Sequence, residues 1–201
     1  MGAVALKDGD LETASDADLL QRSADGDQRA FGEIVSRHLH VPFASARRLL
    51  GDPAEAEDVA QESLVRLWQQ KSALLERPLN LPAWLGRVAA NLAIDRLRAR
   101  KRLDYSDAVP EVPVAPAQQR SIEVVDAAGR VQAALDALPD RQRVAVTLFH
   151  FEEMSQRDVA ALMQVSEDAL ESLLRRGRSG LKSALADEWS SLVASLARDT
   201  A

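Results

Sequence analysis

The chain has 201 residues, 31 of them acidic and 25 basic, and its formal net charge is −6, so it lacks the overall basic excess of a simple nucleic-acid binder. It contains no cysteine, which excludes disulfides, thiol catalysis and cysteine-based zinc sites. No run of eighteen apolar residues is present, so we expect no membrane insertion and a cytoplasmic protein. Only 4% of residues are aromatic, while alanine, leucine and charged residues dominate. That composition favours helices, and we predict an all-α fold.

The N-terminal part of the chain predicts a leader followed by two helices. Residues 1–14 lack the pattern of a secretory signal and are expected to form a loose leader. Ser15 is expected to cap the first helix, and Asp27 the second. Pro42 is expected to kink or break the second helix, because proline cannot donate a backbone hydrogen bond.

An acidic helix is predicted from Asp52 to about Gln70. Asp52 is the expected cap, and Pro53 occupies the first helical position, where proline is favoured. Residues 52–62 contain five acids and no base, a net charge of −5 that suits a basic protein surface. The alternative is an ordinary solvated helix face. The expected buried side chains are Val59, Leu64, Leu67 and Trp68. The candidate partner-binding side chains are Asp58, Gln61 and Glu62.

After a loop at residues 74–81, a long helix is predicted over residues 82–102. Residues 87–102 carry six basic side chains and one acid, a net charge of +5. Exposed aromatic and amide groups beside such a run suit single-stranded DNA, whose bases can stack or flip out. Trp84 is alternatively a core anchor, and the mid-helix polar residues can be ordinary surface polarity. The candidate DNA-binding residues are Trp84, Asn91, Asp95, Arg96 and Arg98.

Prolines interrupt residues 103–121, which we interpret as a linker between a domain at 15–102 and a second domain at 122–201. The second domain contains two short predicted helices, 155–163 and 167–176, separated by three residues. This is the size of a helix-turn-helix, whose second helix can enter a DNA major groove. Ser155 and Ser166 are the expected caps. Residues 183–198 predict an extra tail helix, which either packs on the domain or offers a partner surface.

The second helix of this pair carries the candidate residues for duplex DNA. Arginines here can fix phosphates or read guanine, and an acid can accept from cytosine or repel the backbone. These candidates are Glu171, Arg175, Arg176 and Arg178. The sequence contains no catalytic motif, phosphate-binding loop or metal-ligand spacing, so we expect no enzyme activity, no metal and no cofactor.

Three segments in order resemble the extracytoplasmic-function sigma factors of bacterial RNA polymerase. Residues 54–68 resemble the helix of that family that binds core polymerase. Residues 82–98 resemble its promoter-melting helix. Residues 135–139 and 155–181 resemble its C-terminal promoter-reading domain. The resemblance covers about residues 16–185, and it implies two small helical domains joined by a linker.

The resemblance also implies roles for the candidate residues. Asp58, Gln61 and Glu62 would contact the largest subunits of core polymerase. The loop at 74–81 would hold a flipped base of the proximal promoter element, and Asn91, Asp95, Arg96 and Arg98 would support that strand. Arg175, Arg176 and Arg178 would grip the distal element. An anti-sigma protein is the further partner that the family implies.

Two positions depart from the family pattern. Many members carry a basic residue where Glu171 stands and a polar one where Leu173 stands, so we expect a groove face that has lost cations. This departure keeps two alternatives open: a sigma-like decoy that sequesters an anti-sigma protein, and an ordinary helix-turn-helix regulator. Sigma-like decoys usually carry a receiver domain, for which we expect no room in 201 residues. An ordinary regulator would leave the acidic helix unexplained.

Overall fold

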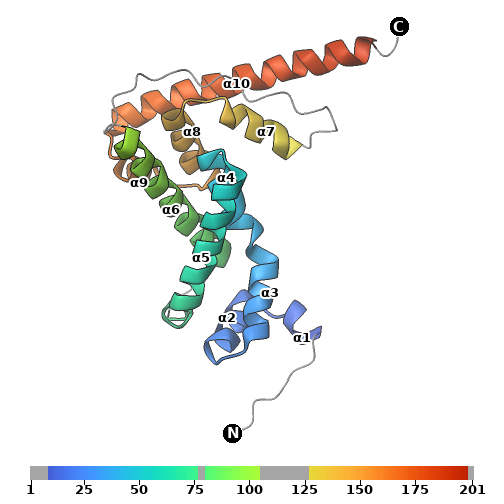
Figure 1. The fold of residues 1–201 in the computed structure, drawn as a ribbon, viewed down its shortest axis with the longest axis vertical. Helices are drawn as coiled ribbons and strands as arrows, with labels where there is room; N and C mark the ends of the chain where they lie inside the picture. Colours follow the sequence, from blue (N-terminus) through green and yellow to red (C-terminus); the bar gives the residue numbers. More distant parts are fainter. Residues whose placement is uncertain (1–8, 77–79, 105–126, 199–201) are drawn as a thin grey trace. The chain divides into compact units, whose positions relative to one another are not determined.

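A computed structural model describes the backbone of residues 9–76, 80–104 and 127–198 and the side chains of residues 11–76, 80–100 and 129–186. All regular structure in the described residues is helical (Figure 1), which confirms the predicted all-α fold. The chain divides into two compact units, Met1–Asp95 and Arg96–Ala201. The predicted domain boundary at residues 103–121 falls mostly outside the described residues and stays a prediction.

The described residues of the first unit form five helices and most of a sixth. They are α1 (Gly9–Glu12), α2 (Asp16–Ala24), α3 (Gln28–His38), α4 (His40–Leu50), α5 (Pro53–Leu74) and α6 (Leu81–Asp104). The predicted caps are confirmed, because the side chains of Ser15, Asp27 and Asp52 each accept a hydrogen bond from the first turn of the helix that follows. These local bonds fix where α2, α3 and α5 begin.

The predicted break near Pro42 is also confirmed. The chain leaves α3 at His38, passes through Leu39 and begins α4 at His40. Pro42 has no N–H to donate to the carbonyl of His38, four residues earlier, so a continuous helix would lose that bond. The break lets α4 take its own course and pack along α5.

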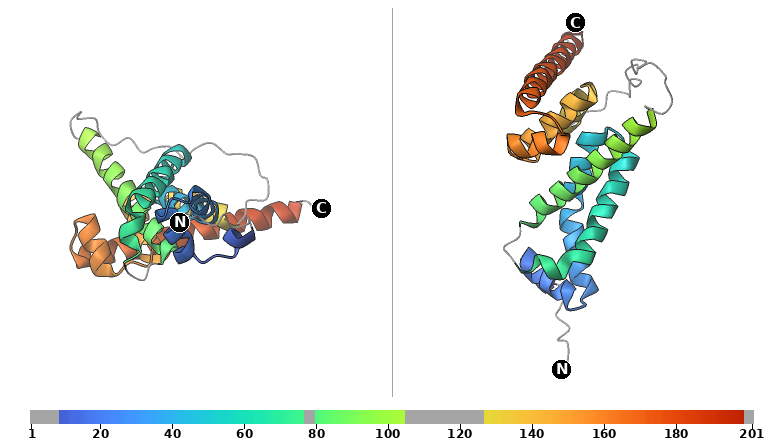
Figure 2. Two further views of the ribbon diagram at one scale, coloured as in Figure 1. Left: turned by 90° about the horizontal axis from the view of Figure 1, so that it is seen from below. Right: turned by 90° about the vertical axis from the view of Figure 1, so that its left-hand side faces the viewer.

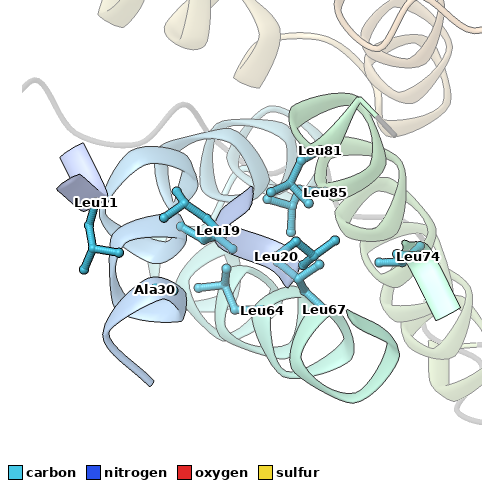
Figure 3. Packing of buried hydrophobic residues seen from close by; sticks show 10 residues of the cluster. Leu11, Leu19, Leu20, Ala30, Leu64, Leu67, Leu74, Leu81 and Leu85 are labelled. Atoms are coloured by element: carbon cyan, nitrogen blue, oxygen red, sulfur yellow. The ribbon is translucent and has the colours of Figure 1, made fainter. Parts of the chain in front are cut away.

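The core of the first unit is a leucine-rich cluster (Figure 3), as expected for a chain with so few aromatic residues. Leu19 of α2, Leu67 of α5 and Leu85 of α6 are fully buried in it. Leu11 also enters this cluster, with only 8% of its surface exposed. The cluster therefore joins α2, α3, α5 and α6 to a residue that the sequence assigned to a loose leader.

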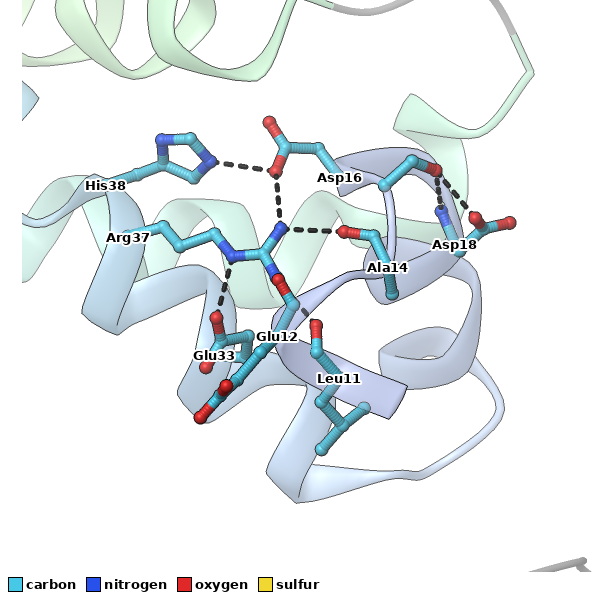
Figure 4. A network of polar contacts seen from close by, with 9 residues as sticks. Leu11, Glu12, Ala14, Asp16, Asp18, Glu33, Arg37 and His38 are labelled. Carbon is cyan, nitrogen blue, oxygen red and sulfur yellow. Dashed lines mark hydrogen bonds and ion pairs between the residues drawn. The ribbon is translucent and has the colours of Figure 1, made fainter. Parts of the chain in front are cut away.

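A polar clamp around Arg37 explains why residues 9–14 are ordered, contrary to the prediction of a loose leader (Figure 4). The guanidinium donates to the backbone oxygens of Leu11, Glu12 and Ala14 at 2.6–2.7 Å. Its Nε donates to Glu33 at 2.7 Å. The carbonyls at the C-terminal end of α1 have few donors available, and one arginine on α3 satisfies them. The leader prediction therefore remains only for residues that the structure does not describe.

Helices α5 and α6 are longer than predicted. Leu74 and Leu81, which the sequence assigned to the loop between them, are the last residue of α5 and the first of α6. Both are buried in the core cluster, and that burial extends the helices toward the loop. Residues 77–79, the centre of the loop proposed to hold a flipped base, lie outside the described residues.

The second unit contains α7 (Ala127–Asp136), α8 (Asp140–Val146), a π-helical turn η1 (Thr147–Phe151), α9 (Gln156–Met163) and α10 (Glu167–Arg198). The predicted caps of the last two helices are confirmed: Asp158 N donates to Ser155 Oγ at 3.1 Å and Ala169 N donates to Ser166 Oγ at 3.2 Å. Residues 183–198 are helical as predicted, but they do not form a separate tail helix, because α10 continues without interruption to Arg198 (Figure 2). The structure does not describe side chains from residue 187 onward.

Two glycines let α10 approach its neighbours closely. A Cβ on Gly177 would lie 2.6 Å from Val146 Cγ2 and 3.3 Å from the backbone oxygen of Gln142. A Cβ on Gly180 would lie 2.5 Å from Leu138 Cδ2. Any larger residue would separate α10 from α8 or displace these side chains. The glycines therefore fix how deeply α10 sits against the second unit.

Candidate functional site

One face of α5 gathers the predicted partner-binding residues. Asp58, Gln61 and Glu62 lie three and four positions apart, the spacing that places side chains together on a helix. Asp58 and Gln61 are exposed, and Glu62 is partly exposed. Glu62 also pairs with Arg66 at 2.8 Å. The buried residues Val59 and Leu67 belong to the other side of the helix, so the structure brings the three predicted residues together on an acidic outer face.

Trp68 corrects the predicted buried side of α5. It is 38% exposed, whereas the other three predicted core residues of α5 are buried. Its ring contacts the edge of Phe31 with centroids 4.9 Å apart, and Lys71 Nζ lies 3.4 Å from the ring centroid. The sequence missed this because an aromatic residue in an amphipathic helix is usually buried.

Val65 extends the outer face of α5, and the sequence analysis missed it. Val65 is 53% exposed. It follows Gln61 by four residues, and Trp68 follows Gln61 by seven. Both apolar side chains therefore continue the face of Asp58 and Gln61. The result is a stripe that is acidic at its N-terminal end and apolar further along.

The candidate residues of α6 fall on two different sides. Trp84, Asn91, Asp95 and Arg98 share one side by their helical spacing, and exposed Arg87 joins them. Trp84 is half-buried and packs partly against the core cluster. Part of its ring therefore serves the core, which was the alternative to DNA binding. Arg96 follows the buried residues Leu85, Ala89 and Leu92 at helical spacing. The structure therefore does not bring Arg96 together with the other four.

The second unit contains the predicted helix-turn-helix. Between α9 and α10 the chain turns through Gln164, Val165 and Ser166. Gln164 is left-handed, with φ 54° and ψ 49°, and its N–H bonds to carbonyls of α9. This geometry ends α9 abruptly and lets Ser166 cap α10. Val159 and Leu170 are fully buried beneath the turn, so the two helices share a core.

The outer side of α10 carries the remaining candidates. Glu171, Arg175, Arg176 and Arg178 are all exposed. Arg176 Nε donates to the backbone oxygen of Ser172 in its own helix at 3.2 Å. Lys182, also exposed, extends the basic stretch. Four cations thus occupy residues 175–182 of a helix whose other side is packed.

Leu173 corrects one expectation about this helix. The sequence analysis counted Leu173 as a cation lost from the groove face. Leu173 is only 8% exposed and lies on the buried side of α10 with Leu170 and Leu174. Its apolar side chain therefore belongs to the core, and the departure of the outer face is confined to Glu171.

Within the described residues, no helix is long and apolar enough to cross a membrane. No group of three or more histidine, aspartate or glutamate side chains among them is placed to hold a metal ion.

Comparison with known proteins identifies both units. Residues 34–103 match the sigma-70 region 2 family, and residues 128–181 match the sigma-70 region 4 family. The ECF RNA polymerase sigma factor SigE of Mycolicibacterium smegmatis is 31% identical over 88% of this chain and 74% of its own length. The RNA polymerase sigma factor CnrH of Cupriavidus metallidurans is 33% identical over 85% of this chain and 95% of its own length.

A solved structure shares the fold. The sigma factor RpoE of Bartonella quintana, in complex with the anti-sigma factor NepR, aligns with a TM-score of 0.50 and 26% identity over 78% of this chain and 96% of that one. The helical fold and the helix-turn-helix are typical of a DNA-binding protein. Its matches to both regions, in order, place it more narrowly: the chain belongs to the extracytoplasmic-function sigma factors of bacterial RNA polymerase. It is an alternative sigma factor that binds core RNA polymerase and directs transcription initiation at promoters.

Proposed function

We propose that this sigma factor divides its work among three faces. The acidic face of α5 docks on core RNA polymerase, the α6 face holds the melted proximal element, and α10 grips the distal element as duplex. The observation that carries the proposal is the separation of charge: Asp58, Gln61 and Glu62 share an outer face of α5, whereas three cations share an outer face of α10, namely Arg175, Arg178 and Lys182. Opposite charges steer two such faces to different partners.

The proposed polymerase-binding face has an acidic and an apolar part. Asp58 and Glu62 supply negative charge that suits a basic surface on the largest polymerase subunits. Val65 and Trp68 continue the same stripe and are both exposed, at 53% and 38%. Buried apolar anchors surrounded by charges are typical of protein interfaces. We therefore include Val65 and Trp68 in this face.

The proposed DNA faces differ in the form of DNA that they suit. On α6, Trp84, Asn91 and Asp95 share one side with Arg98, a mixture of aromatic, amide and cationic groups that fits an unpaired strand. Arg96 lies on the other side of that helix, so we assign it no direct strand contact. On α10, cations follow a helix-turn-helix and fit the phosphates of a duplex groove.

A regulatory partner completes the proposal. The relative RpoE forms a complex with an anti-sigma factor. We propose that an anti-sigma protein also binds this chain, and that the chain acts in the cytoplasm, where RNA polymerase works. The ordinary regulator is less favoured because it leaves the match to sigma-70 region 2 unexplained. The decoy is less favoured because the relatives SigE and CnrH are RNA polymerase sigma factors.

Run-off transcription tests the proposed function directly. Core polymerase with this protein should produce transcripts of defined length from a promoter selected out of a random library, and core polymerase alone should not. Tight binding to core polymerase without initiation at any selected promoter would contradict the proposal and favour the decoy.

Charge reversal tests the α5 face. Asp58→Lys with Glu62→Lys should raise the Kd for core polymerase by about tenfold or more, because both charges face the proposed basic partner. Folding should change little, because an exposed pair such as Glu62 with Arg66 contributes only about 0.3–0.5 kcal/mol. Binding is measured by fluorescence anisotropy with labelled sigma factor.

The matched control is Asp25→Lys with Glu76→Lys, which changes the net charge by the same amount at exposed positions elsewhere in the first unit. This variant should bind core polymerase like the unmodified chain. Equal weakening in both variants would show that only net charge matters and would remove the assignment to α5.

A further inference from the structure

Glu171 differs from the cations that follow it along α10 in carrying a negative charge. It is exposed in the second turn of α10 and makes no hydrogen bond or ion pair within the described part of the chain. Arg175 lies four residues later, the spacing at which helical ion pairs form. Among the described residues, however, no ion pair joins these two side chains. The carboxylate is therefore available to an external donor.

The buried side of α10 fixes the direction in which Glu171 faces. Leu170, Leu174 and Gly177 follow each other at helical spacing and are all buried. Glu171, Arg175, Arg178 and Lys182 repeat at the same helical spacing one position later along the chain and are all exposed. The outer stripe therefore carries a carboxylate in its first part and three cations in its second part.

Helix-turn-helix geometry gives the two parts of this stripe different targets. The N-terminal turns of the second helix contact base edges in the major groove, and residues further along can fix phosphates. The three cations suit phosphates. A carboxylate is repelled by phosphate and can only accept hydrogen bonds, so it requires a donor on a base edge.

The chemistry of the base edges selects one base. In the major groove, guanine presents two acceptors and thymine presents an acceptor and a methyl group. Adenine presents its amino donor next to the N7 acceptor. The N7 acceptor repels a carboxylate, whereas an amide can bond to both groups. Cytosine presents the N4 amino donor without an acceptor of its own. A carboxylate at this position therefore favours cytosine.

We propose that Glu171 is a specificity-determining residue that reads the amino group of a cytosine in the distal promoter element, while Arg175, Arg178 and Lys182 hold the backbone beside it. This inference rests on the proposed function of α10. It explains why a helix that binds an anionic polymer carries an unpaired carboxylate in its outer stripe.

The test compares base preferences in the assembled holoenzyme. Core polymerase with the unmodified chain, E171Q or the control E153Q is bound to a promoter library whose distal element is randomised, and the bound DNA is sequenced. Glu153 is an exposed carboxylate outside the stripe, so E153Q makes the same charge change without altering the reading residue. Circular dichroism shows that each variant is folded.

The unmodified chain should prefer cytosine at one distal position by about fivefold or more over other bases. E171Q should lose that preference and shift it toward adenine, because an amide matches the adenine edge, and E153Q should keep it. If E171Q raises affinity for every sequence equally and changes no preference, the carboxylate only repels the backbone and the inference is overturned.

The proposed function can fail separately. If the unmodified holoenzyme shows no preference at any distal position, both the distal role of α10 and the role of Glu171 are wrong. If a preference exists and E171Q leaves it intact, α10 or another element still reads the distal element, and only the assignment to Glu171 falls.

Discussion

Gln164 occupies a backbone conformation that its side chain disfavours. Its φ of 54° is in the left-handed region, where it ends α9 and starts the turn of the helix-turn-helix. The left-handed conformation costs a non-glycine residue roughly 1–2 kcal/mol. Replacement by glycine would remove this cost, but glycine's greater freedom in the unfolded chain would cancel about 0.4–1 kcal/mol of the gain. The turn is thus held by its surroundings at a local cost.

Gln164→Gly should therefore stabilise the second unit by about 0.5–1 kcal/mol. Hydrogen exchange of the α9 and α10 amides measures this stability in the full chain. Gln164→Ala is the control, because alanine also removes the long side chain but keeps the left-handed strain, and it should give no gain. Equal gains in both variants would assign the effect to the side chain.

Single residues also show where sequence reasoning works. Caps at Ser15, Asp27, Asp52, Ser155 and Ser166 were predictable because each bond joins residues two or three positions apart. The environments of Trp68 and Leu173 were not, since periodicity locates an apolar stripe only to within a neighbouring residue or two. Whether Trp68 or Leu173 is buried depends on which helices pack alongside.

At the scale of the element, Gly177 determines how closely α10 packs against α8. In an isolated helix, Gly→Ala is stabilising by about 1 kcal/mol. Here the added methyl group would meet the branched side chain of Val146 at 2.6 Å and a backbone oxygen at 3.3 Å. Gly177→Ala should therefore destabilise the second unit by about 1–3 kcal/mol, despite its better helix propensity.

Gly180→Ala is the matched comparison for that prediction. Its added methyl group would meet only Leu138 Cδ2, the far end of a flexible side chain, so the loss should be smaller. Urea denaturation of the full chain, followed by hydrogen exchange of α10, compares the two. A stabilising Gly177→Ala would mean that α10 does not sit as closely as the structure shows.

The segment from Gly9 to Ala14 forms a second element-scale feature, because Arg37 holds its carbonyls. Arg37→Ala should cost about 2 kcal/mol, since the hydrogen bonds of a charged group are among the stronger ones in proteins. It should also release the segment to cleavage after Glu12 by a glutamate-specific protease. Arg37→Lys keeps the charge but not the planar fork of donors, so cleavage at an intermediate rate is expected.

Unchanged cleavage in Arg37→Ala would show that burial of Leu11 alone holds the segment. The sequence could not predict this clamp, because its bonds join residues more than twenty positions apart. Helices α2 to α6 followed from local signals, whereas the extra lengths of α5 and α6 depend on burial of Leu74 and Leu81 in a shared core.

At the scale of the whole molecule, an acidic chain binds an acidic polymer. The net charge is −6, yet Arg175, Arg178 and Lys182 of α10 share one outer stripe. The order of the units and the charge of each face were predictable from sequence, because they depend on composition along the chain. The sides of α6 on which Arg96 and Arg98 lie required the helical register and the core.

Salt dependence separates the faces in the assembled holoenzyme. Arg175→Ala with Arg178→Ala should reduce the slope of log K against log salt for promoter binding by about 2, since each lost phosphate contact lowers it by about 0.9. Asp58→Lys with Glu62→Lys, measured with core polymerase in saturating amounts, should leave the slope unchanged. Their effects should add in the combined variant, because the residues lie in separate units. An altered slope in the α5 variant would contradict this division.

The two glycines of α10 also make the second unit a suitable scaffold for exchanging the residues that recognise DNA. The glycines fix the distance between α10 and the residues packed against it, and the buried leucines fix the orientation of α10 about its own axis. Residues on the outward stripe can therefore be exchanged as a set without repacking anything beneath them. A panel of such grafts would turn one scaffold into initiation factors with mutually exclusive target sites.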